Sequence, residues 1–506
     1  MLDVYACGNT ATRAMKSHMP QRKPLKKTVA GNGLTKRVFP CPHFPFLLTL
    51  AVLLGVGTLN IITASGFSVQ PFQSFKPGNV LVLVADDFGV DKVGLYNIGT
   101  NPPKTPNLDA LAQKGMVFRN AYSNPMCCPT RATIQTGRYS FRTGIGWIIQ
   151  AEPAYAMQLS EVAIPEMLDN GNSGYAHAAF GKWHLGNGTV GGALAPNNAG
   201  YSYYAGSLAN ITNYFSWNKT TNGVTALTTK YATTDTVDEA LAWINTQTKS
   251  WFAYVAFNAP HKPYHAPPSN LHSVDLTNPT TILQYSAMVE AMDTEIGRLL
   301  MGLERMGALK NTTIIFMGDN GTPTEVIQPP LNPLHSKTTL YEGGINVPFI
   351  VQSPYISRPG VESKAFVGTV DVFATVAQIA GVNLTNTLPP GTKIDSISLI
   401  PYLEKPSTPS IRPMNFAEKF DPNGSTNGLI YHPPTPNPST SSVKAARNEK
   451  YKLIWDLITQ KEEFYDLESD PFEQQNLLAG GSLLPNSSEQ AAYTQLKQQI
   501  ISLVSS

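Results

Sequence analysis

The chain has 506 residues, of which 42% are hydrophobic and 14% are charged, with 37 basic against 35 acidic side chains. Eight basic residues and one acidic residue, Asp3, lie within the first 44 positions, so the remaining chain has 34 acidic against 29 basic residues. This negative balance disfavours nucleic acid as a partner. Two of the four cysteines, Cys7 and Cys41, also precede residue 45. We therefore expect no disulfide framework, and a chain of this length can bury the core of two or three domains without one.

The N-terminal segment is a basic leader followed by an apolar run. Residues 45–67 contain no charged side chain. This order is typical of an export signal, and a run of about 20 apolar residues also suits a signal anchor that spans a membrane. We expect residues 1–67 to be one of these two. Either one predicts export to the lumen of the secretory pathway, the extracellular space or the periplasm, and an uncleaved leader would anchor the protein in a membrane.

Four apolar runs of the following chain each end in polar or charged residues. Such runs are typical of strands buried on both faces of a parallel sheet. In open α/β sheets the binding crevice lies beyond the carboxyl ends of the strands, so the four ends predict one shared crevice. The runs and the polar residues after them are 79–85 with Asp86 and Asp87, 175–180 with Lys182 and His184, 251–257 with Asn258 and His261, and 312–318 with Asp319 and Asn320.

Helical patterns lie between these strands. The clearest is an apolar stripe with a spacing of three or four residues, which predicts an amphipathic helix packed against the core. Alternating strands and helices predict an α/β fold with a mostly parallel sheet. Paired acids after an apolar run also suit a helix cap or a turn, so the residues at the strand ends do not by themselves establish a site. The stripe consists of Met288, Met292, Ile296, Leu299 and Leu303.

The segment 127–138 reads Cys-Cys-Pro-Thr-Arg-Ala-Thr-Ile-Gln-Thr-Gly-Arg. Pro129 favours the first turn of a helix that ends near Gly137, so Cys127 is expected at a helix N-terminus. Free backbone N–H groups and the helix dipole favour an anion there. Adjacent cysteines also occur simply as small buried hydrophobic residues.

This segment resembles the signature C-x-P-(S/A/T)-R-x-x-x-x-T-G-R of the sulfatase family, and other segments resemble further elements of that family. The resemblance implies that a formylglycine-generating enzyme oxidises Cys127 to formylglycine. The hydrate of this aldehyde would be the nucleophile that attacks a sulfate ester. The further matches are G-K-W-H-L-G at 181–186, A-P-H-x-P at 259–263, G-D-N-G at 318–321 and K-x-x-x-Y-E-G-G at 337–344.

The resemblance also implies the roles of the site residues. One divalent cation, calcium or alternatively magnesium, would be held by oxygen ligands and by the modified cysteine. The catalytic residues implied are Cys127, Arg131, Lys182, His184, His261 and Lys337. The implied metal ligands are Asp86, Asp87, Cys127, Asp319 and Asn320, and the implied substrate-binding residues are Lys182, His261 and Lys337.

The fold implied is the alkaline-phosphatase-like α/β sandwich, with a large, mostly parallel mixed sheet between helices. Residues 77–403 would form the catalytic domain. Residues 404–506 would form a smaller domain with a short antiparallel sheet and a helix, since Tyr451–Ile454 resembles the closing strand of the family and 463–471 its L-Y-D-L-x-x-D-P turn. Two positions depart from the family: Ala374 stands where its D-x-x-P-T helix start has proline, and Phe464 stands where the turn has leucine.

Three functions fit these residues. The first is arylsulfatase-like hydrolysis of a sulfate monoester. The second is formylglycine-dependent hydrolysis of phosphonate or phosphate diesters, and the third is binding of sulfated glycans without catalysis. The substrate is not identified by a motif, because the tyrosines in the loop 193–217, at positions 201, 203, 204 and 214, could stack on a ring or pack in the core.

Overall fold

A computed structural model describes residues 78–150, 155–425, 440–481, 483–485 and 487–506. These described residues belong to one compact unit. The expected leader, including the apolar run 45–67, lies outside them. Within the described ranges, no helix is both long enough and apolar enough to cross a membrane.

The larger sheet has ten strands in the order β10-β2-β9-β8-β1-β7-β3-β4-β5-β6. Within it, β5 and β9 run opposite to the other eight strands, so the expected mostly parallel sheet is confirmed. The strands are β1 Asn79–Ala85, β2 Met116–Tyr122, β3 Ala176–Lys182, β4 Tyr203–Ser207, β5 Trp217–Thr221, β6 Val224–Thr228, β7 Trp251–Ala256, β8 Thr312–Gly318, β9 Phe349–Gln352 and β10 Val361–Gly368.

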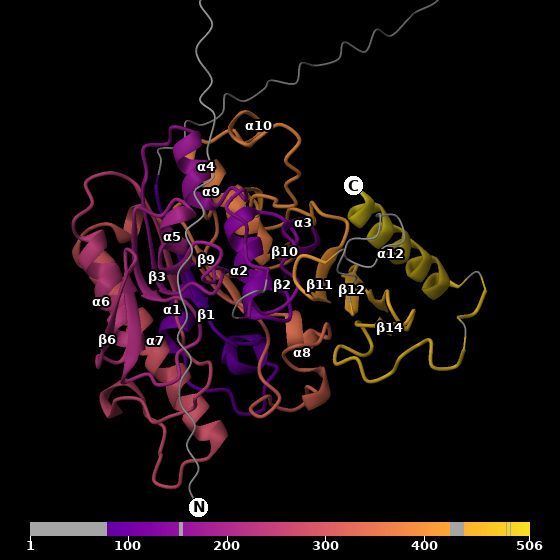
Figure 1. The fold of residues 1–506 in the computed structure, drawn as a ribbon. Helices are drawn as coiled ribbons and strands as arrows, with labels where there is room; N and C mark the ends of the chain where they lie inside the picture. The colour runs from indigo at the N-terminus through magenta and orange to yellow at the C-terminus, as the bar shows by residue number, and fades with distance from the viewer. Residues whose placement is uncertain (1–77, 151–154, 426–439, 482, 486) are drawn as a thin grey trace, which may run out of the picture. The chain divides into compact units, whose positions relative to one another are not determined.

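Helices cover both faces of this sheet (Figure 1). Side chains alternate between the two faces of a strand. Val80, Val82 and Val84 of β1 therefore belong to one hydrophobic cluster, and Leu81 and Leu83 belong to the other. The first cluster includes side chains of α2 Cys127–Thr136, α4 Ile164–Asn170 and α9 Val372–Ala380, and the second includes side chains of α1 Pro106–Gln113, α6 Ala232–Ile244 and α7 Thr281–Arg305.

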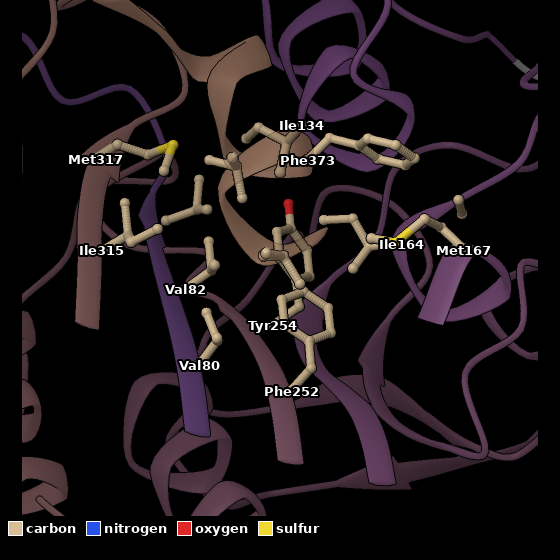
Figure 2. Packing of buried hydrophobic residues seen from close by; sticks show 14 of the residues in the cluster. Val80, Val82, Ile134, Ile164, Met167, Phe252, Tyr254, Ile315, Met317 and Phe373 are labelled. Atoms are coloured by element: carbon tan, nitrogen blue, oxygen red, sulfur yellow. The ribbon is translucent and has the colours of Figure 1, made fainter. Parts of the chain in front are cut away.

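Figure 2 shows how the first cluster packs. Strand side chains such as Val82 and Tyr254 point toward Ile134 of α2, Ile164 of α4 and Phe373 of α9. All five are almost completely buried. Burying an aliphatic or aromatic side chain of this size stabilises a fold by roughly 1.5–3 kcal/mol. This cluster fixes α2 to the sheet and, with it, the position of Cys127 at the first turn of the helix.

The predicted helical stripe forms the buried face of α7. Its five apolar residues, from Met288 to Leu303, are all 0% exposed. The helix begins after Thr280, whose side chain accepts a hydrogen bond from the backbone N–H of Leu283, as a threonine at an N-cap does. Shorter helices lie in the connections: α3 Ser140–Thr143, α5 Ala195–Asn198, α8 Glu342–Ile345, α10 Leu384–Thr387 and α11 Ile400–Glu404.

A second, four-stranded sheet follows in the chain (Figure 1). All its neighbouring strands are antiparallel, and one helix packs on it through a separate hydrophobic cluster. The expected C-terminal antiparallel sheet and helix are therefore confirmed, while the boundary between residues 403 and 404 stays a prediction. The elements are β11 Asn415–Asp421, β12 Ser441–Arg447, β13 Tyr451–Asp456, β14 Glu462–Asp466 and α12 Ser488–Ser505.

Candidate active site

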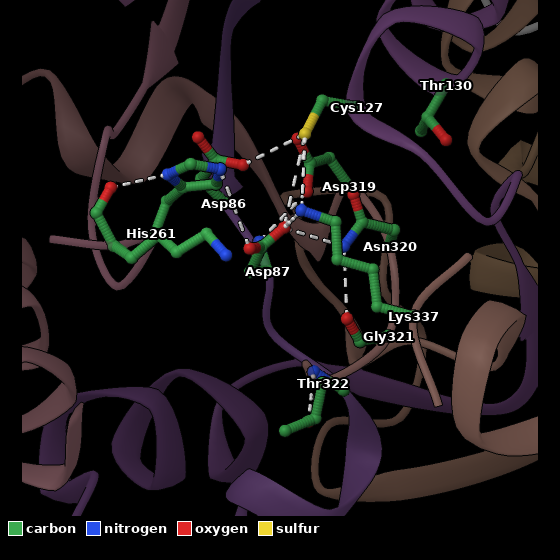
Figure 3. A network of polar contacts seen from close by, with 12 residues as sticks. Asp86, Asp87, Cys127, Thr130, His261, Asp319, Asn320, Gly321, Thr322 and Lys337 are labelled. Atoms are coloured by element: carbon green, nitrogen blue, oxygen red, sulfur yellow. Dashed lines mark hydrogen bonds and ion pairs between the residues drawn. The ribbon is translucent and has the colours of Figure 1, made fainter. Parts of the chain in front are cut away.

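The site lies at the carboxyl ends of the central strands. Asp86 and Asp87 follow β1, Asp319 and Asn320 follow β8, and Lys182 is the last residue of β3. Strands β8, β1, β7 and β3 are neighbours in that order, so residues far apart in the sequence meet at one edge. Figure 3 shows Asp86, Asp87, His261, Asp319 and Lys337 gathered around Cys127. The strand ends that the sequence singled out therefore lie at one edge of the sheet.

Cys127 is the first residue of α2 and is 1% exposed. Met126, the N-cap residue, has an extended backbone, and the helix ends at Gly137, whose φ of 67° is in the left-handed region that suits glycine. The Sγ atom of Cys127 lies 3.3 Å from Asp86 Oδ1 and 4.0 Å from Asp87 Oδ1. The helix therefore directs its N-terminus and this side chain at the acidic residues.

Three buried carboxylates and Cys127 form a cluster. One ligand atom from each of Asp86, Asp87, Asp319 and Cys127 lies within 4.8 Å of the others. Asn320 donates from Nδ2 to Asp87 Oδ1 at 2.8 Å, while its buried Oδ1 has no hydrogen-bond partner. Buried charges and acceptors without partners are costly. Hard oxygen ligands that share a small space suit a divalent cation such as calcium or magnesium, so the residues fit the cation that the sequence implied.

Basic residues surround the cluster from three directions. Arg131 of α2 donates from Nη2 to Asp319 Oδ2 at 2.8 Å and from Nη1 to the carbonyl of Lys182 at 2.8 Å. Lys182 Nζ lies 2.5 Å from Asp86 Oδ2, and Lys337 Nζ lies 2.5 Å from Asp87 Oδ1. The Lys337 ammonium is also 4.0 Å from Cys127 Sγ. Of these three basic residues, Lys337 lines the cavity at Cys127, whereas Arg131 and Lys182 are buried beside the carboxylates.

These surroundings shift the carboxyl groups in opposite directions. Burial alone would raise the pKa of Asp86, but the charges of Lys182, His261 and Arg131 outweigh it and hold that pKa far below its ordinary value. Burial and the charge of Asp86 raise the pKa of Asp319 to about 6, against the opposing effect of Arg131. Two carboxyl groups with separated pKa values are suited to different roles.

The thiol of Cys127 is a poor nucleophile in this environment. Burial raises its pKa well above the ordinary value, and the charges of Asp319 and Asp86 raise it further. The thiolate is the reactive form of cysteine. The raised pKa therefore keeps the unmodified thiol in its less reactive form.

His261 lies on the loop after β7, with Nε2 at 3.8 Å from Asp87 Oδ2. Its Nδ1 is 2.7 Å from the carbonyl oxygen of Lys262. A carbonyl only accepts, so Nδ1 carries a proton, and Nε2 faces the cluster, where it donates only when the ring is protonated. Burial lowers the pKa of His261, against the charges of Asp87 and Asp86.

His184 follows β3 and is also buried, with a left-handed φ of 61°. Its backbone N–H donates to the carbonyl of Leu208 at 3.0 Å, and its Nδ1 has no hydrogen-bond partner. Burial lowers its pKa well below the ordinary value, helped by the charges of Lys182 and Arg131. His184 is therefore a neutral imidazole beside the basic part of the site.

A cavity of about 350 Å³ opens onto the cluster. Four of the predicted site residues line it, Asp87, Cys127, His261 and Lys337, whereas Arg131, Lys182 and His184 do not. Residues that the sequence patterns did not identify complete its wall: Met126, Ile148, Asn210, Lys262, Pro323, Thr324, Glu325 and Thr338.

The tyrosines of the loop 193–217 serve packing. Tyr201, Tyr204 and Tyr214 are each 1% exposed, so they offer no face to a ligand. Half-buried Tyr203 donates to Glu239. Tyr214 nevertheless supports the site, because its hydroxyl lies 2.6 Å from the carbonyl of Asn258 and 2.7 Å from that of His261. No motif in the sequence indicated this contact, which joins two distant segments.

Fold and site together have the form of an α/β enzyme that binds an anionic substrate at the carboxyl edge of its sheet. The family described as Sulfatase matches residues 78–382. The chain therefore belongs to the sulfatase family.

Individual relatives agree with this assignment. Rat (Rattus norvegicus) N-acetylgalactosamine-6-sulfatase is 30% identical over 370 residues, which cover 65% of this chain and 66% of the relative. The match thus spans just under two thirds of the relative's length. Mouse (Mus musculus) arylsulfatase J is 30% identical over 328 residues, which cover 60% of this chain and 52% of that relative.

A solved structure supports the fold. The crystal structure of Ps i-CgsB in complex with k-i-k-neocarrahexaose superposes with a TM-score of 0.70 at 24% sequence identity, covering 85% of this chain and 93% of that chain. The expected α/β sandwich, with a large, mostly parallel mixed sheet between helices, is therefore confirmed.

Proposed function

We propose that this protein hydrolyses a sulfate monoester and that formylglycine made from Cys127 is its nucleophile. The observation that carries the proposal is the position of Cys127, at the first turn of α2 with Sγ 3.3 Å from Asp86 and 4.0 Å from the Lys337 ammonium. A helix N-terminus and a lysine stabilise an anion at this point. The family assignment supports sulfate as that anion.

Two groups would complete the site. A calcium or magnesium ion held by Asp86, Asp87, Asp319 and Asn320, together with the modified residue 127, would act as a Lewis acid. Formylglycine in its hydrated form supplies one hydroxyl to attack sulfur and a second whose deprotonation releases sulfate. The unmodified thiol, with its raised pKa, does neither.

The chain's own residues then have separate tasks. Lys337, His261 and Lys182 bind and orient the sulfate oxygens, and Lys337 or His261 gives a proton to the departing alcohol. Arg131 holds Asp319 through two hydrogen bonds.

Proton transfers complete the scheme. Asp319 has the most basic carboxyl of the cluster and takes the proton of the attacking hydroxyl. His184, a neutral imidazole, serves as the base for the release step. Proton transfer of this kind typically contributes about 10²- to 10⁴-fold in rate.

Aryl, glycan and lipid sulfates all fit this proposal. The two relatives described above are named arylsulfatase J and N-acetylgalactosamine-6-sulfatase, and both are 30% identical to this chain. Parallel rate measurements on an aryl sulfate, sulfated sugars and an aryl phosphonate would separate these substrates and would also test the alternative of a phosphonate or phosphodiester hydrolase.

Maturation and export belong to the same proposal. A formylglycine-generating enzyme would be the maturation partner and would read Pro129 and Arg131 of the signature. The basic leader and the run 45–67 support export. We propose a location outside the cytosol, with a membrane anchor if the leader is retained.

The first experiment is mass spectrometry of the tryptic peptide 120–131, from protein produced together with a formylglycine-generating enzyme, alongside a turnover assay. We expect Cys127 to exchange its sulfur and two hydrogens for one oxygen, and sulfate to be released in multiple turnovers. Cys127→Ser should fold and release no more than one equivalent. An unmodified thiol in active protein, or full multiple turnover by C127S, would contradict the proposed nucleophile. A modified but inactive protein would favour a sulfated-glycan-binding relative without catalysis.

A further inference from the structure

The residue after Lys337 has an unusual backbone conformation. Thr338 has a φ of 79°, in the left-handed region that a β-branched residue rarely adopts. Its side chain is exposed, so packing of that side chain does not account for the conformation. A conformation of this kind persists only where the surrounding structure holds it, and it often marks a functional site. Here it immediately follows the lysine that lies 2.5 Å from Asp87.

Three hydrogen bonds hold this part of the loop. The backbone N–H of Lys337 donates to the carbonyl of Thr322 at 3.0 Å, and that of Thr338 donates to the carbonyl of Pro125 at 3.0 Å. The third bond runs from Lys419 Nζ to the carbonyl oxygen of Thr338 at 2.9 Å. Two of these bonds therefore join the loop to backbone carbonyls of neighbouring loops, and the third is donated by a side chain of the second sheet.

Lys419 lies on β11 and is half-buried beside the ring of Trp147, with Nζ 5.9 Å from the ring centre. Burial lowers its pKa, and Asp456 opposes that effect. In the part of the chain that the structure describes, no carboxylate forms an ion pair with Lys419. Removing an ammonium from water is costly. Among the described residues, the hydrogen bond to Thr338 is the polar contact that the Lys419 ammonium makes.

We propose that Lys419 is a positioning residue for Lys337. Its hydrogen bond holds the Thr338 carbonyl so that Thr338 stays left-handed, and this conformation directs the Lys337 side chain toward Asp87 and Cys127. The second sheet thereby controls a group that binds sulfate in the proposed function, on which this inference rests. Lys419 itself does not line the cavity at Cys127.

A double-mutant cycle tests the proposal. Glycine adopts a left-handed conformation at little cost, so Thr338→Gly should make the loop less dependent on Lys419. We expect Lys419→Met to lower kcat/KM by about tenfold or more, since small displacements of a binding group have effects of this size. In the T338G background, Lys419→Met should lower kcat/KM by less than about threefold. Lys104→Met, which removes an exposed lysine bonded to Ser273, is the control.

Binding of inorganic sulfate, measured by calorimetry, is the second readout and does not require turnover. Its Kd should rise in K419M and change less when T338G is also present. Equal losses in both backgrounds would overturn the proposal, because a general electrostatic or stability effect of Lys419 does not depend on residue 338. The proposal would also be overturned if the wild type is active and K419M has the same kcat/KM and the same Kd for sulfate as the wild type. A wild type that is modified but inactive would contradict the proposed function instead, and the sulfate titrations would still decide the role of Lys419.

Discussion

Lys182 Nζ lies 2.5 Å from Asp86 Oδ2, and both side chains are completely buried. The pair joins the end of β3 to the end of β1 across the intervening strand β7. Neither charge has water to stabilise it, so each depends on the other and on the neighbouring groups of the site. Lys182 is therefore part of the site and also stabilises the fold around it.

Lys182→Met should therefore reduce both activity and stability. The variant leaves Asp86 buried without its nearest cation, and breaking one side of a buried pair typically costs about 3–5 kcal/mol. We expect the free energy of unfolding in urea to fall by an amount of that order and turnover to be lost. Lys104→Met should change neither quantity. A K182M protein as stable as the wild type would show that the remaining charges, such as those of Arg131 and His261, are enough to compensate Asp86.

Calcium should stabilise the protein through the carboxylate cluster. Three buried carboxylates and the unpaired Oδ1 of Asn320 favour a bound cation, and a ligand at 100 times its Kd stabilises the folded state by about 2.7 kcal/mol. We expect Tm to rise with calcium concentration and activity to fall after chelation. Asn320→Ala should move the Tm response to higher calcium concentration, whereas Asn386→Ala, at an exposed position, should not. A Tm independent of calcium and magnesium would exclude the cation from this cluster.

The residues that sequence patterns could predict are those whose position follows from a strand or helix end. The expected run 79–85 is β1, and 312–318 is β8. Because these strands are neighbours, Asp86 and Asp319 had to meet. Sequence patterns contain no comparable signal for contacts that depend on the conformation of a loop. Lys419 bonds Thr338 from 81 positions away, and no periodic pattern places a lysine of one sheet against a backbone carbonyl of a distant loop.

Glu473 should make stability depend on pH. It accepts a hydrogen bond from the backbone N–H of Glu342 at 2.6 Å and lies 2.7 Å from Lys452 Nζ. Burial raises its pKa to about 7, with Lys452 opposing and Glu342 adding to the shift. The folded state thus keeps a proton that the unfolded chain releases near pH 4.5, so the contribution of this group falls as pH rises from about 4.5 to 7.

Glu473→Gln should remove that dependence and still accept the bond from Glu342. We expect the stability of wild type relative to E473Q to decrease between pH 5 and about 8, measured by urea unfolding at several pH values. Exposed Glu468→Gln is the matched control, because that side chain lies at the surface. A difference between wild type and E473Q that stays constant over this range would mean that Glu473 has the same pKa in the folded and unfolded states.

Tyr214→Phe should hold the loop that carries His261 less firmly and leave the functional groups of the site unchanged. The hydroxyl of Tyr214 lies within 2.7 Å of two carbonyls on the loop that carries His261, while the ring packs against His265 with centres 4.3 Å apart. Phenylalanine keeps the ring and removes the hydroxyl, so stability should fall by about 1 kcal/mol. We also expect kcat/KM to fall by roughly threefold to tenfold, because the loop that carries His261 loses this support.

Tyr201→Phe is the control. It removes an equally buried hydroxyl, bonded to Gln135 at 2.9 Å, and should lower stability by a similar amount with kcat/KM unchanged. Equal kinetic effects of Y214F and Y201F would show that the Tyr214 hydroxyl serves packing alone.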